Sequence, residues 1–298
     1  MLDPRSLEKR RDEIAEACER RGVAVDLDGA IAAQKRVASL QTELGELNRC
    51  KNDHQAGGRC KLAPEEREAH VAEGRRLKEE GARSEAELAE AERALEALLL
   101  AIPNLVHPES PKGGEADFRE LRRVGEPPHF DFAARDHLAI GESLGLFDFE
   151  GGARVAGQKW YFLRREAVLL DLALQRFAIE TAMRAGYVPF VTPDVARRQI
   201  VDGLAFAPRG AETQIYSLAG TDLDLIGTAE ITLGGLHSDQ VLDAAQLPVR
   251  MVGLSHCFRT EAGAAGKESR GLYRVHQFTK VELFAIARPE ESEALHDE

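Results

Sequence analysis

The sequence predicts an α+β protein, in which a long antiparallel pair of helices precedes an antiparallel β-sheet flanked by helices. Three observations lead to this fold class. Apolar residues recur in alternating steps of three and four through residues 27–102, which is typical of a coiled coil. Pro103 and Pro108 then interrupt the pattern. Beyond them, short segments of alternating apolar and polar residues, typical of strands, are interspersed with helical segments.

Two long helices with a break between them are expected from Leu27 to Ile102. The seam positions are Ala30, Ala33, Val37, Leu40, Leu44 and Leu47 in the first helix, and Leu77, Ser84, Leu88, Ala91, Leu95, Leu98 and Ile102 in the second. Gly57 and Gly58 suit the reversal, and Pro64 suits the first turn of the returning helix. By periodicity alone, a spacer or dimerisation hairpin is the favoured interpretation.

A domain boundary follows the second helix, so we expect an N-terminal domain of residues 1–104 and a second domain of residues 105–298. In the second domain, residues 131–144 and 166–185 are expected to form helices. The glycine-rich Gly151–Gly157 is expected to be a turn before a strand over residues 159–163.

The composition favours a cytoplasmic protein outside the membrane. No apolar run has membrane-spanning length, and the acidic residues near the N-terminus do not fit a secretory signal. The four cysteines are widely spaced, which suits free thiols in a reducing compartment. Cys50, His54 and Cys60 lack a fourth ligand at regular spacing, so no metal site is predicted.

The net charge of −12 argues against binding nucleic acid by bulk attraction, but local basic clusters remain compatible with RNA. The first cluster lies at the break between the long helices, and the second lies near the end of the chain. Their members are Arg49, Lys51, Arg59 and Lys61, and Lys267, Arg270 and Arg274.

The most informative segment is residues 255–282, SHCFRTEAGAAGKESRGLYRVHQFTKVE. It predicts two antiparallel strands joined by a glycine-rich loop, and the alternation of the second strand places Phe278 and Glu282 on one face. An arginine suits a phosphate, an aromatic face suits a base, and carboxylates suit amino groups. Arg259, Glu261, Arg274, Phe278 and Glu282 therefore predict a nucleotide and amino-acid site.

This segment resembles motif 2 of the class II aminoacyl-tRNA synthetases, in the version carried by bacterial-type seryl-tRNA synthetases. The helix of residues 166–185, Gly186 and the short segment to Pro193 resemble motif 1, the dimer-interface element. The triplet Thr228-Ala229-Glu230 is similar to the serine-binding loop of the same family. The resemblance covers nearly the whole chain.

The resemblance implies a serine–tRNA ligase, which activates L-serine with ATP to seryl-adenylate and transfers it to tRNA(Ser), with tRNA(Sec) as a further acceptor. It implies ATP and Mg²⁺ as cofactors, a homodimer formed through motif 1, and tRNA contacts from the helical arm and the motif 2 loop. Arg259 and Glu261 would be the catalytic residues. The resemblance assigns ATP binding to Arg259, Thr260, Glu261, Val275 and Phe278; serine binding to Thr228, Ala229, Glu230 and Glu282; and tRNA contacts to Arg49, Lys51, Arg59, Lys61, Lys267 and Arg270.

One element of the family pattern has no counterpart in this sequence. No stretch resembles motif 3, which supplies a second arginine and the expected Mg²⁺ ligand, so we expect a fragment, a split-gene half or a degenerate copy with slow adenylate formation. The alternative function is a non-catalytic tRNA-binding paralogue. A relative that aminoacylates carrier proteins should lack the arm, and a purely structural coiled-coil protein would explain only the first part of the chain.

Overall fold

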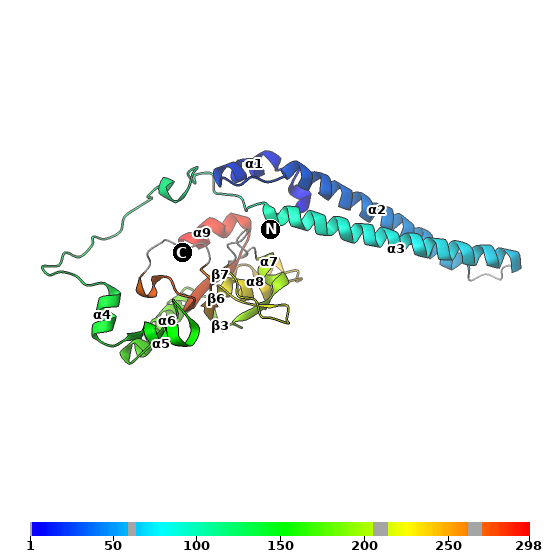
Figure 1. Ribbon diagram of the computed structural model, residues 1–298. Helices are drawn as coiled ribbons and strands as arrows, with labels where there is room; N and C mark the ends of the chain where they lie inside the picture. Colours follow the sequence, from blue (N-terminus) through cyan, green and yellow to red (C-terminus); the bar gives the residue numbers. More distant parts are fainter. Residues whose placement is uncertain (1, 59–63, 205–213, 262–269) are drawn as a thin grey trace. The chain divides into compact units, whose positions relative to one another are not determined.

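The computed structural model describes residues 2–58, 64–204, 214–261 and 270–298 (Figure 1). The chain divides into two compact units, Met1–Gly125 and Glu126–Glu298. Among the described residues, no helix is both long enough and apolar enough to cross a membrane.

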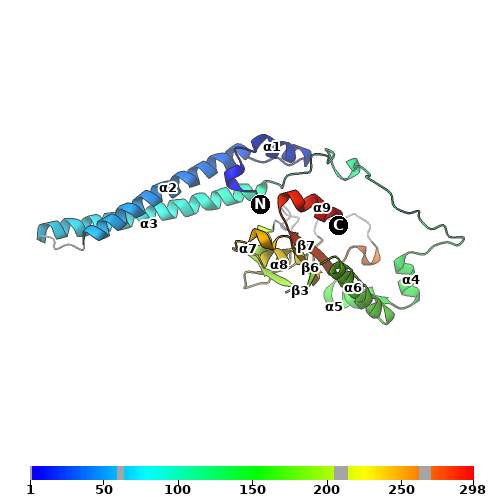
Figure 2. The ribbon, with the colours of Figure 1, turned by 180° about the vertical axis from the view of Figure 1, so that it is seen from behind.

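The first unit is a helical hairpin with a short helix packed at its base. It contains α1 (Arg11–Arg20), α2 (Leu27–Gly57) and α3 (Pro64–Ala101). Asp26 caps the start of α2 by accepting a hydrogen bond from the Gly29 amide at 2.8 Å. The two long helices lie side by side in both views (Figures 1 and 2). The predicted antiparallel arm is therefore confirmed.

The core of this unit follows the predicted seam and extends it into α1. Val37 and Leu40 of α2, and Leu77 and Leu95 of α3, are buried. At the base of the arm, the buried cluster also takes in residues of the N-terminal segment, namely Leu7, Ile14 and Cys18. The burial of these apolar side chains, more than helix propensity, stabilises such long helices.

Histidines replace aliphatic side chains near the far end of the arm. The rings of His54 and His70 stack with centroids 3.7 Å apart, and His54 Nε2 lies 2.9 Å from the carbonyl oxygen of His70. A β-carbon at Gly58 or Gly74 would meet one of these two rings, so both glycines leave room for them. Near His54 and His70, the two helices are therefore packed by imidazole rings in place of aliphatic side chains.

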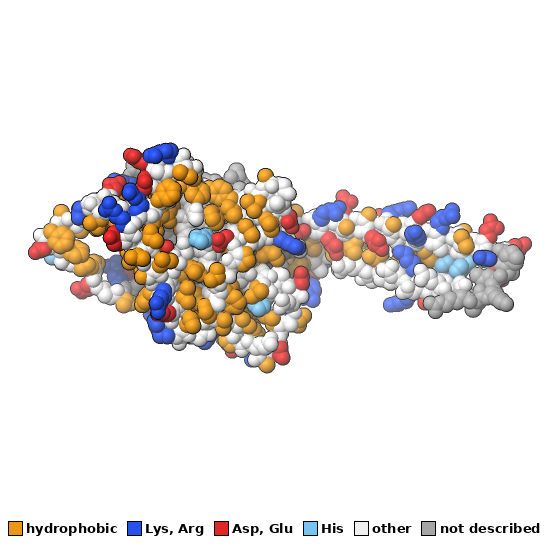
Figure 3. All heavy atoms as spheres, turned by 90° about the horizontal axis from the view of Figure 1, so that it is seen from below, with side chains coloured by type: hydrophobic (Ala, Val, Ile, Leu, Met, Phe, Trp, Pro, Cys, Tyr) orange, Lys and Arg blue, Asp and Glu red, His pale blue; other side chains and the backbone are white. Residues whose placement is uncertain are grey.

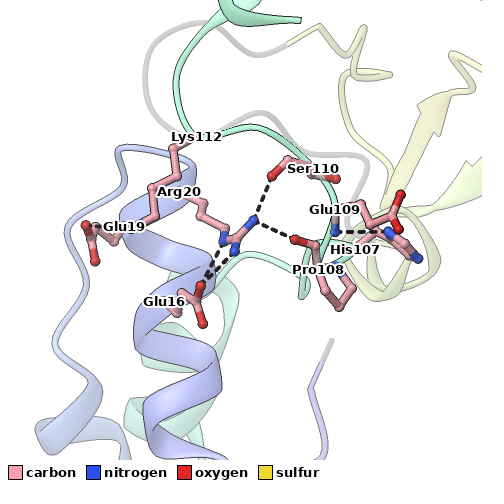
Figure 4. Close-up of polar contacts among 8 residues, drawn as sticks. All are labelled: Glu16, Glu19, Arg20, His107, Pro108, Glu109, Ser110 and Lys112. Carbon is pink, nitrogen blue, oxygen red and sulfur yellow. Dashed lines mark hydrogen bonds and ion pairs between the residues drawn. The ribbon is translucent and has the colours of Figure 1, made fainter. Parts of the chain in front are cut away.

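A network of hydrogen bonds fixes the chain that leaves α3 against α1 (Figure 4). Arg20 donates to the carbonyl oxygens of Pro108 at 3.0 Å and Ser110 at 2.6 Å, and to the Glu16 carboxylate at 2.8 Å. Lys112 forms an ion pair with Glu19 at 3.1 Å. These contacts hold residues 108–112 against α1 within the first unit.

The second unit is a small mixed sheet with helices on both faces. Its helices are α4 (His137–Ser143), α5 (Phe149–Ala156), α6 (Glu166–Arg184), α7 (Arg198–Gly203), α8 (Ala229–Gly235) and α9 (Ser292–Asp297). Its strands are β1 (Phe147–Asp148), β2 (Phe162–Leu163), β3 (Val188–Val191), β4 (Val195–Arg197), β5 (Leu223–Leu225), β6 (Val249–Phe258) and β7 (Gln277–Ile286).

The main sheet has the strand order β3-β6-β7. Strand β3 runs parallel to β6, whereas β6 and β7 form the predicted antiparallel pair over their full length. The two remaining pairs, β1-β2 and β4-β5, are short and antiparallel.

Helices α6 and α8 cover opposite faces of the main sheet (Figure 1). On the α6 side, Val252 packs with Ala182 and Tyr187. On the α8 side, Met251 packs with Ala229 and Leu233. Neighbouring residues of β6 point to opposite faces of the sheet. Val252 is therefore buried by α6, and Met251 by α8.

Two local predictions for this unit are wrong. Residues 149–156 form α5 where a turn was expected over Gly151–Gly157, and the strand after it is limited to β2. Gly152 is buried, and a β-carbon there would lie 2.2 Å from the Trp160 carbonyl oxygen, so glycine permits a close helix–strand approach. The helix expected over residues 131–144 is shortened to α4, because Asp136 caps it by accepting from the Ala139 amide.

Candidate functional site

The predicted site residues gather on the α8 side of the β6–β7 hairpin. The register pairs Cys257 with Phe278 and Gly253 with Glu282. Opposite Glu282, a β-carbon at Gly253 would lie 2.9 Å from the Ala229 β-carbon. The missing side chain at Gly253 therefore lets the first turn of α8 approach the strand pair and brings the residues before it to Glu282.

Thr228 connects α8 to the hairpin. It is the N-cap of α8, it is 2% exposed, and its hydroxyl donates to the Glu282 carboxylate at 2.9 Å. The Thr228 hydroxyl oxygen also accepts a hydrogen bond from Lys280 Nζ at 3.1 Å. Lys280 also forms an ion pair with Glu282. A hydroxyl, a carboxylate and an ammonium group thus meet at one end of the site.

Arg259 and Phe278 occupy the other end. The guanidinium carbon of Arg259 lies 5.2 Å from the centroid of the Phe278 ring, within the range of a cation–π contact. Nε and Nη2 of Arg259 donate to the Gly227 carbonyl oxygen at 3.3 and 3.2 Å. The arginine is thereby held beside both the aromatic ring and the residue that precedes Thr228.

Glu261, which follows β6, is held by Arg274, which precedes β7. Arg274 Nη1 donates to its carboxylate at 2.7 Å, and the Glu261 side chain is only 11% exposed. The backbone of Glu261 has a φ of 52°, in the left-handed region that a side-chain-bearing residue rarely adopts. Such strained residues cluster at functional sites, where the surrounding structure holds them in place.

Two further residues that the sequence did not single out hold the site together. The alternation of the second strand predicts Lys280 and His276 on the same face as Phe278 and Glu282, but it assigns neither of them a role. His276 Nδ1 lies 2.8 Å from the Arg259 carbonyl oxygen and 3.0 Å from the Tyr216 hydroxyl. Burial raises the pKa of the Tyr216 hydroxyl, and the charge of Glu261 adds to this effect, so the phenol is neutral beside the site.

The remaining residues predicted to bind ATP or serine differ in burial and in hydrogen bonding. Thr260 follows Arg259, and its amide donates to the Gln214 carbonyl at 3.1 Å. Val275 and Ala229 are buried, whereas Glu230 in the first turn of α8 is exposed.

The predicted tRNA contacts are described only in part. Arg49 on α2 and Arg270 before the second strand are exposed, and Lys51 is half-buried on the side of the arm that faces Gly81. Arg59, Lys61 and Lys267 lie outside the described residues.

The described residues offer no metal centre. They contain no group of three or more His, Cys, Asp or Glu side chains arranged to hold a metal ion. The Glu261 carboxylate is paired with Arg274. The described residues therefore do not fit a Mg²⁺ site by themselves.

Cys257 lies under the site and is fully buried. Burial raises the pKa of its thiol, although the hydrogen bond with Ser255 and, to a lesser extent, the charges of Lys280 and Arg259 lower it. Since the thiolate is the reactive form, this thiol should be inert at neutral pH.

We expect iodoacetamide at pH 8 to alkylate Cys50, which is exposed, at least about tenfold faster than Cys257 and Cys18, which are buried. Mass spectrometry of a Cys60→Ser background would measure the three rates. Equal labelling of Cys257 and Cys50 would contradict the burial of the strand beneath the site.

Comparison with known proteins places both units in one family. Residues 1–106 match the model of the seryl-tRNA synthetase N-terminal domain, and residues 216–297 match the class II core domain of the synthetases for G, H, P, S and T. A serine–tRNA ligase of Treponema denticola is 46% identical over 299 aligned residues, which span 100% of this chain and 71% of that protein. The chain belongs to the serine–tRNA ligase family.

Other members agree with this assignment. The serine–tRNA ligase of Rhodopirellula baltica is 48% identical, and the match covers 100% of this chain and 70% of that protein. Among solved structures, the seryl-tRNA synthetase of Pyrococcus horikoshii complexed with ATP superposes with a TM-score of 0.81 at 30% identity, covering 100% of this chain and 72% of the other. The serine–tRNA ligase of Naegleria fowleri in complex with AMP gives a TM-score of 0.75 at 27% identity.

Proposed function

We propose that this seryl-tRNA synthetase family member binds ATP and L-serine on the α8 side of the β6–β7 hairpin and joins them as seryl-adenylate. The observation that carries the proposal is the order of groups on this face, with Arg259 and Phe278 at one end and Thr228 and Glu282 at the other. A cation with an aromatic ring suits a nucleotide, and a carboxylate with a hydroxyl suits a small polar amino acid.

ATP would bind at the end of the site formed by Arg259 and Phe278, where it would replace the contact between these two side chains. The adenine would take the face of Phe278 that the Arg259 guanidinium now covers at 5.2 Å, and its amino group would donate to Glu261. Arg259, released from the ring, would hold the α-phosphate with its planar fork of donors. Thr260 and Val275, at the ends of the two strands, would border the nucleotide.

Serine would bind at the second end. Its ammonium would meet the Glu282 carboxylate, and its hydroxyl would meet Thr228 and Glu230, with Ala229 forming the wall between them. A serine carboxylate oxygen would then attack the α-phosphorus, forming the O–P bond as the bond to the bridging oxygen breaks and pyrophosphate leaves with the electron pair. The protein would contribute orientation and charge stabilisation to this step.

The arm would present the acceptor RNA to this site. Double-stranded RNA is recognised largely through its backbone and shape, which suits exposed cations such as Arg49 on a long helix. Lys51, Arg59 and Lys61 would extend this contact, and Lys267 and Arg270 would meet the acceptor end. The proposed acceptors are tRNA(Ser) and tRNA(Sec), in the cytoplasm. Mg²⁺ would arrive on the ATP phosphates, as is usual for this ion in nucleotide sites.

A homodimer is part of the proposal because α6 has apolar side chains that the described chain does not bury. Figure 3 shows hydrophobic side chains gathered over the face of the second unit that carries α5 and α6. The exposed large apolar side chains on α6 are Val168, Leu169, Leu170, Leu172, Leu174, Phe177 and Met183. An apolar surface of this extent is typical of a protein interface.

We expect the pair Leu169→Glu and Phe177→Glu to shift the chain from dimer to monomer in sedimentation-velocity experiments, because two charges would be buried without partners at the interface. Leu169 and Phe177 are 68% and 65% exposed in the described chain, so their replacement should leave the monomer folded. Val241→Glu, at a fully exposed site away from α6, is the matched control. A variant that stays dimeric would place the interface elsewhere.

The single tryptophan provides a direct test of the proposed function. The Trp160 ring lies 5.6 Å from that of His276, whose ring contacts the Arg259 backbone. ATP binding should therefore change Trp160 fluorescence, and L-serine should enable pyrophosphate exchange into ATP where alanine does not. A chain that binds tRNA(Ser) but gives neither signal would be the non-catalytic paralogue.

A further inference from the structure

Lys280 lies between Phe278 and Glu282 on β7, and its ammonium meets Glu282 and Thr228 at the proposed serine end of the site. Alternate residues of a strand share a face and lie about 7 Å apart, so Phe278, Lys280 and Glu282 follow one another along the same side of β7. The Lys280 ammonium contacts Glu282 and lies 3.1 Å from the Thr228 hydroxyl. The side chains of Lys280 and Glu282 are 32% and 20% exposed, which leaves both accessible to a small ligand.

In this state, the lysine ammonium holds the carboxylate that would bind the ammonium of an amino acid. Thr228 serves both charges, donating to Glu282 and accepting from Lys280. An amine that lacks a carboxylate would have to displace the lysine and leave its charge uncompensated. An amino acid carries both charges, so it can replace the Lys280–Glu282 ion pair by two new ones, between its ammonium and Glu282 and between its carboxylate and Lys280.

We propose that Lys280 is a serine-binding residue that selects for the substrate carboxylate. The amino acid inserts between the members of the Lys280–Glu282 pair, its ammonium going to Glu282 and its carboxylate to Lys280. This places the carboxylate on the side of Glu282 nearer to Arg259 and Phe278, where the proposed adenylation requires it.

This inference rests on the proposed function and predicts a change in a ratio of affinities. Ethanolamine, which is serine without its carboxylate, is the comparison ligand. Lys280→Met removes the charge but keeps much of the apolar side chain, so L-serine affinity should fall about 10- to 100-fold. Ethanolamine affinity should rise, because Glu282 then has no competing cation. Lys280→Arg should restore most of the preference for L-serine.

Equilibrium dialysis of the unchanged chain and both variants with radiolabelled L-serine and ethanolamine tests the proposal. A decrease of about tenfold or more in the serine-to-ethanolamine affinity ratio of Lys280→Met, recovered in Lys280→Arg, is the expected result. Because a misfolded variant would lose both ligands together, the ratio separates a charge effect from a structural one. If the unchanged chain binds L-serine and the ratio is the same in Lys280→Met, the role of Lys280 is overturned while the proposed function stands. If the unchanged chain binds no L-serine, both are overturned.

Discussion

Arg259→Ala is expected to weaken ATP binding about 100-fold. The guanidinium is the cation that contacts Phe278 in the described structure, and its proposed role is a charge-assisted contact to the α-phosphate. Loss of such a contact costs about 2 to 3 kcal/mol, and about 1.4 kcal/mol corresponds to a tenfold change in affinity. Serine-dependent pyrophosphate exchange should decrease further, since charge develops at this phosphate in the transition state.

Titration of ATP against Trp160 fluorescence measures the affinity. Arg197→Ala is the matched control, because Arg197 is an exposed arginine of the same unit, at the end of β4. Arg259→Lys should recover only part of the affinity, since lysine lacks the planar fork. Equal ATP affinity in Arg259→Ala and Arg197→Ala would remove Arg259 from the nucleotide site.

Much of the fold could be predicted because its elements leave clear local signals. The three-four apolar steps and the Gly57–Gly58 and Pro64 break define α2 and α3 almost to the residue. The period of two, expected over residues 272–286, likewise predicts one face of β7, although the strand begins only at Gln277 because a 3-10 helix occupies Gly271–Tyr273. The register with β6 then brings Arg259 close to Phe278. In both cases the sequence period equals the geometric period of the element.

What could not be predicted depends on contacts between distant segments. Gly151 and Gly152 indicate a turn locally, yet the tight approach of Trp160 to Gly152 favours a helix with glycine at that position. The parallel pairing of β3 with β6 has no local signal either, because pairing direction is set by how the chain crosses between them.

The same limit applied within the site. The alternation of β7 gives Lys280 a face but no role. Its role depends on Thr228, which approaches because Gly253 has no side chain. Glu230, placed in the serine pocket by resemblance, is exposed in the described structure. Its role remains a prediction that a serine-bound state would test.

Glu282→Gln is expected to weaken L-serine binding about 30- to 100-fold while ATP affinity stays within about threefold. Glutamine keeps the shape of the side chain and an oxygen that accepts from Thr228, so the hydrogen bond of 2.9 Å can persist. What is lost is the charge that would hold the substrate ammonium. The same change leaves Lys280 without its ion-pair partner, so the site becomes cationic where it was balanced.

This imbalance distinguishes Glu282→Gln from Lys280→Met. Ethanolamine should lose affinity in Glu282→Gln and gain it in Lys280→Met, whereas L-serine should lose affinity in both. The double variant Lys280→Met/Glu282→Gln should bind L-serine better than the product of the two single effects predicts, because neither remaining group is an unpaired charge. Glu290→Gln, at an exposed position after β7, is the control for a change of net charge alone. Losses that simply multiply in the double variant would show that the two side chains act separately, and the ion pair would then have no part in selecting serine.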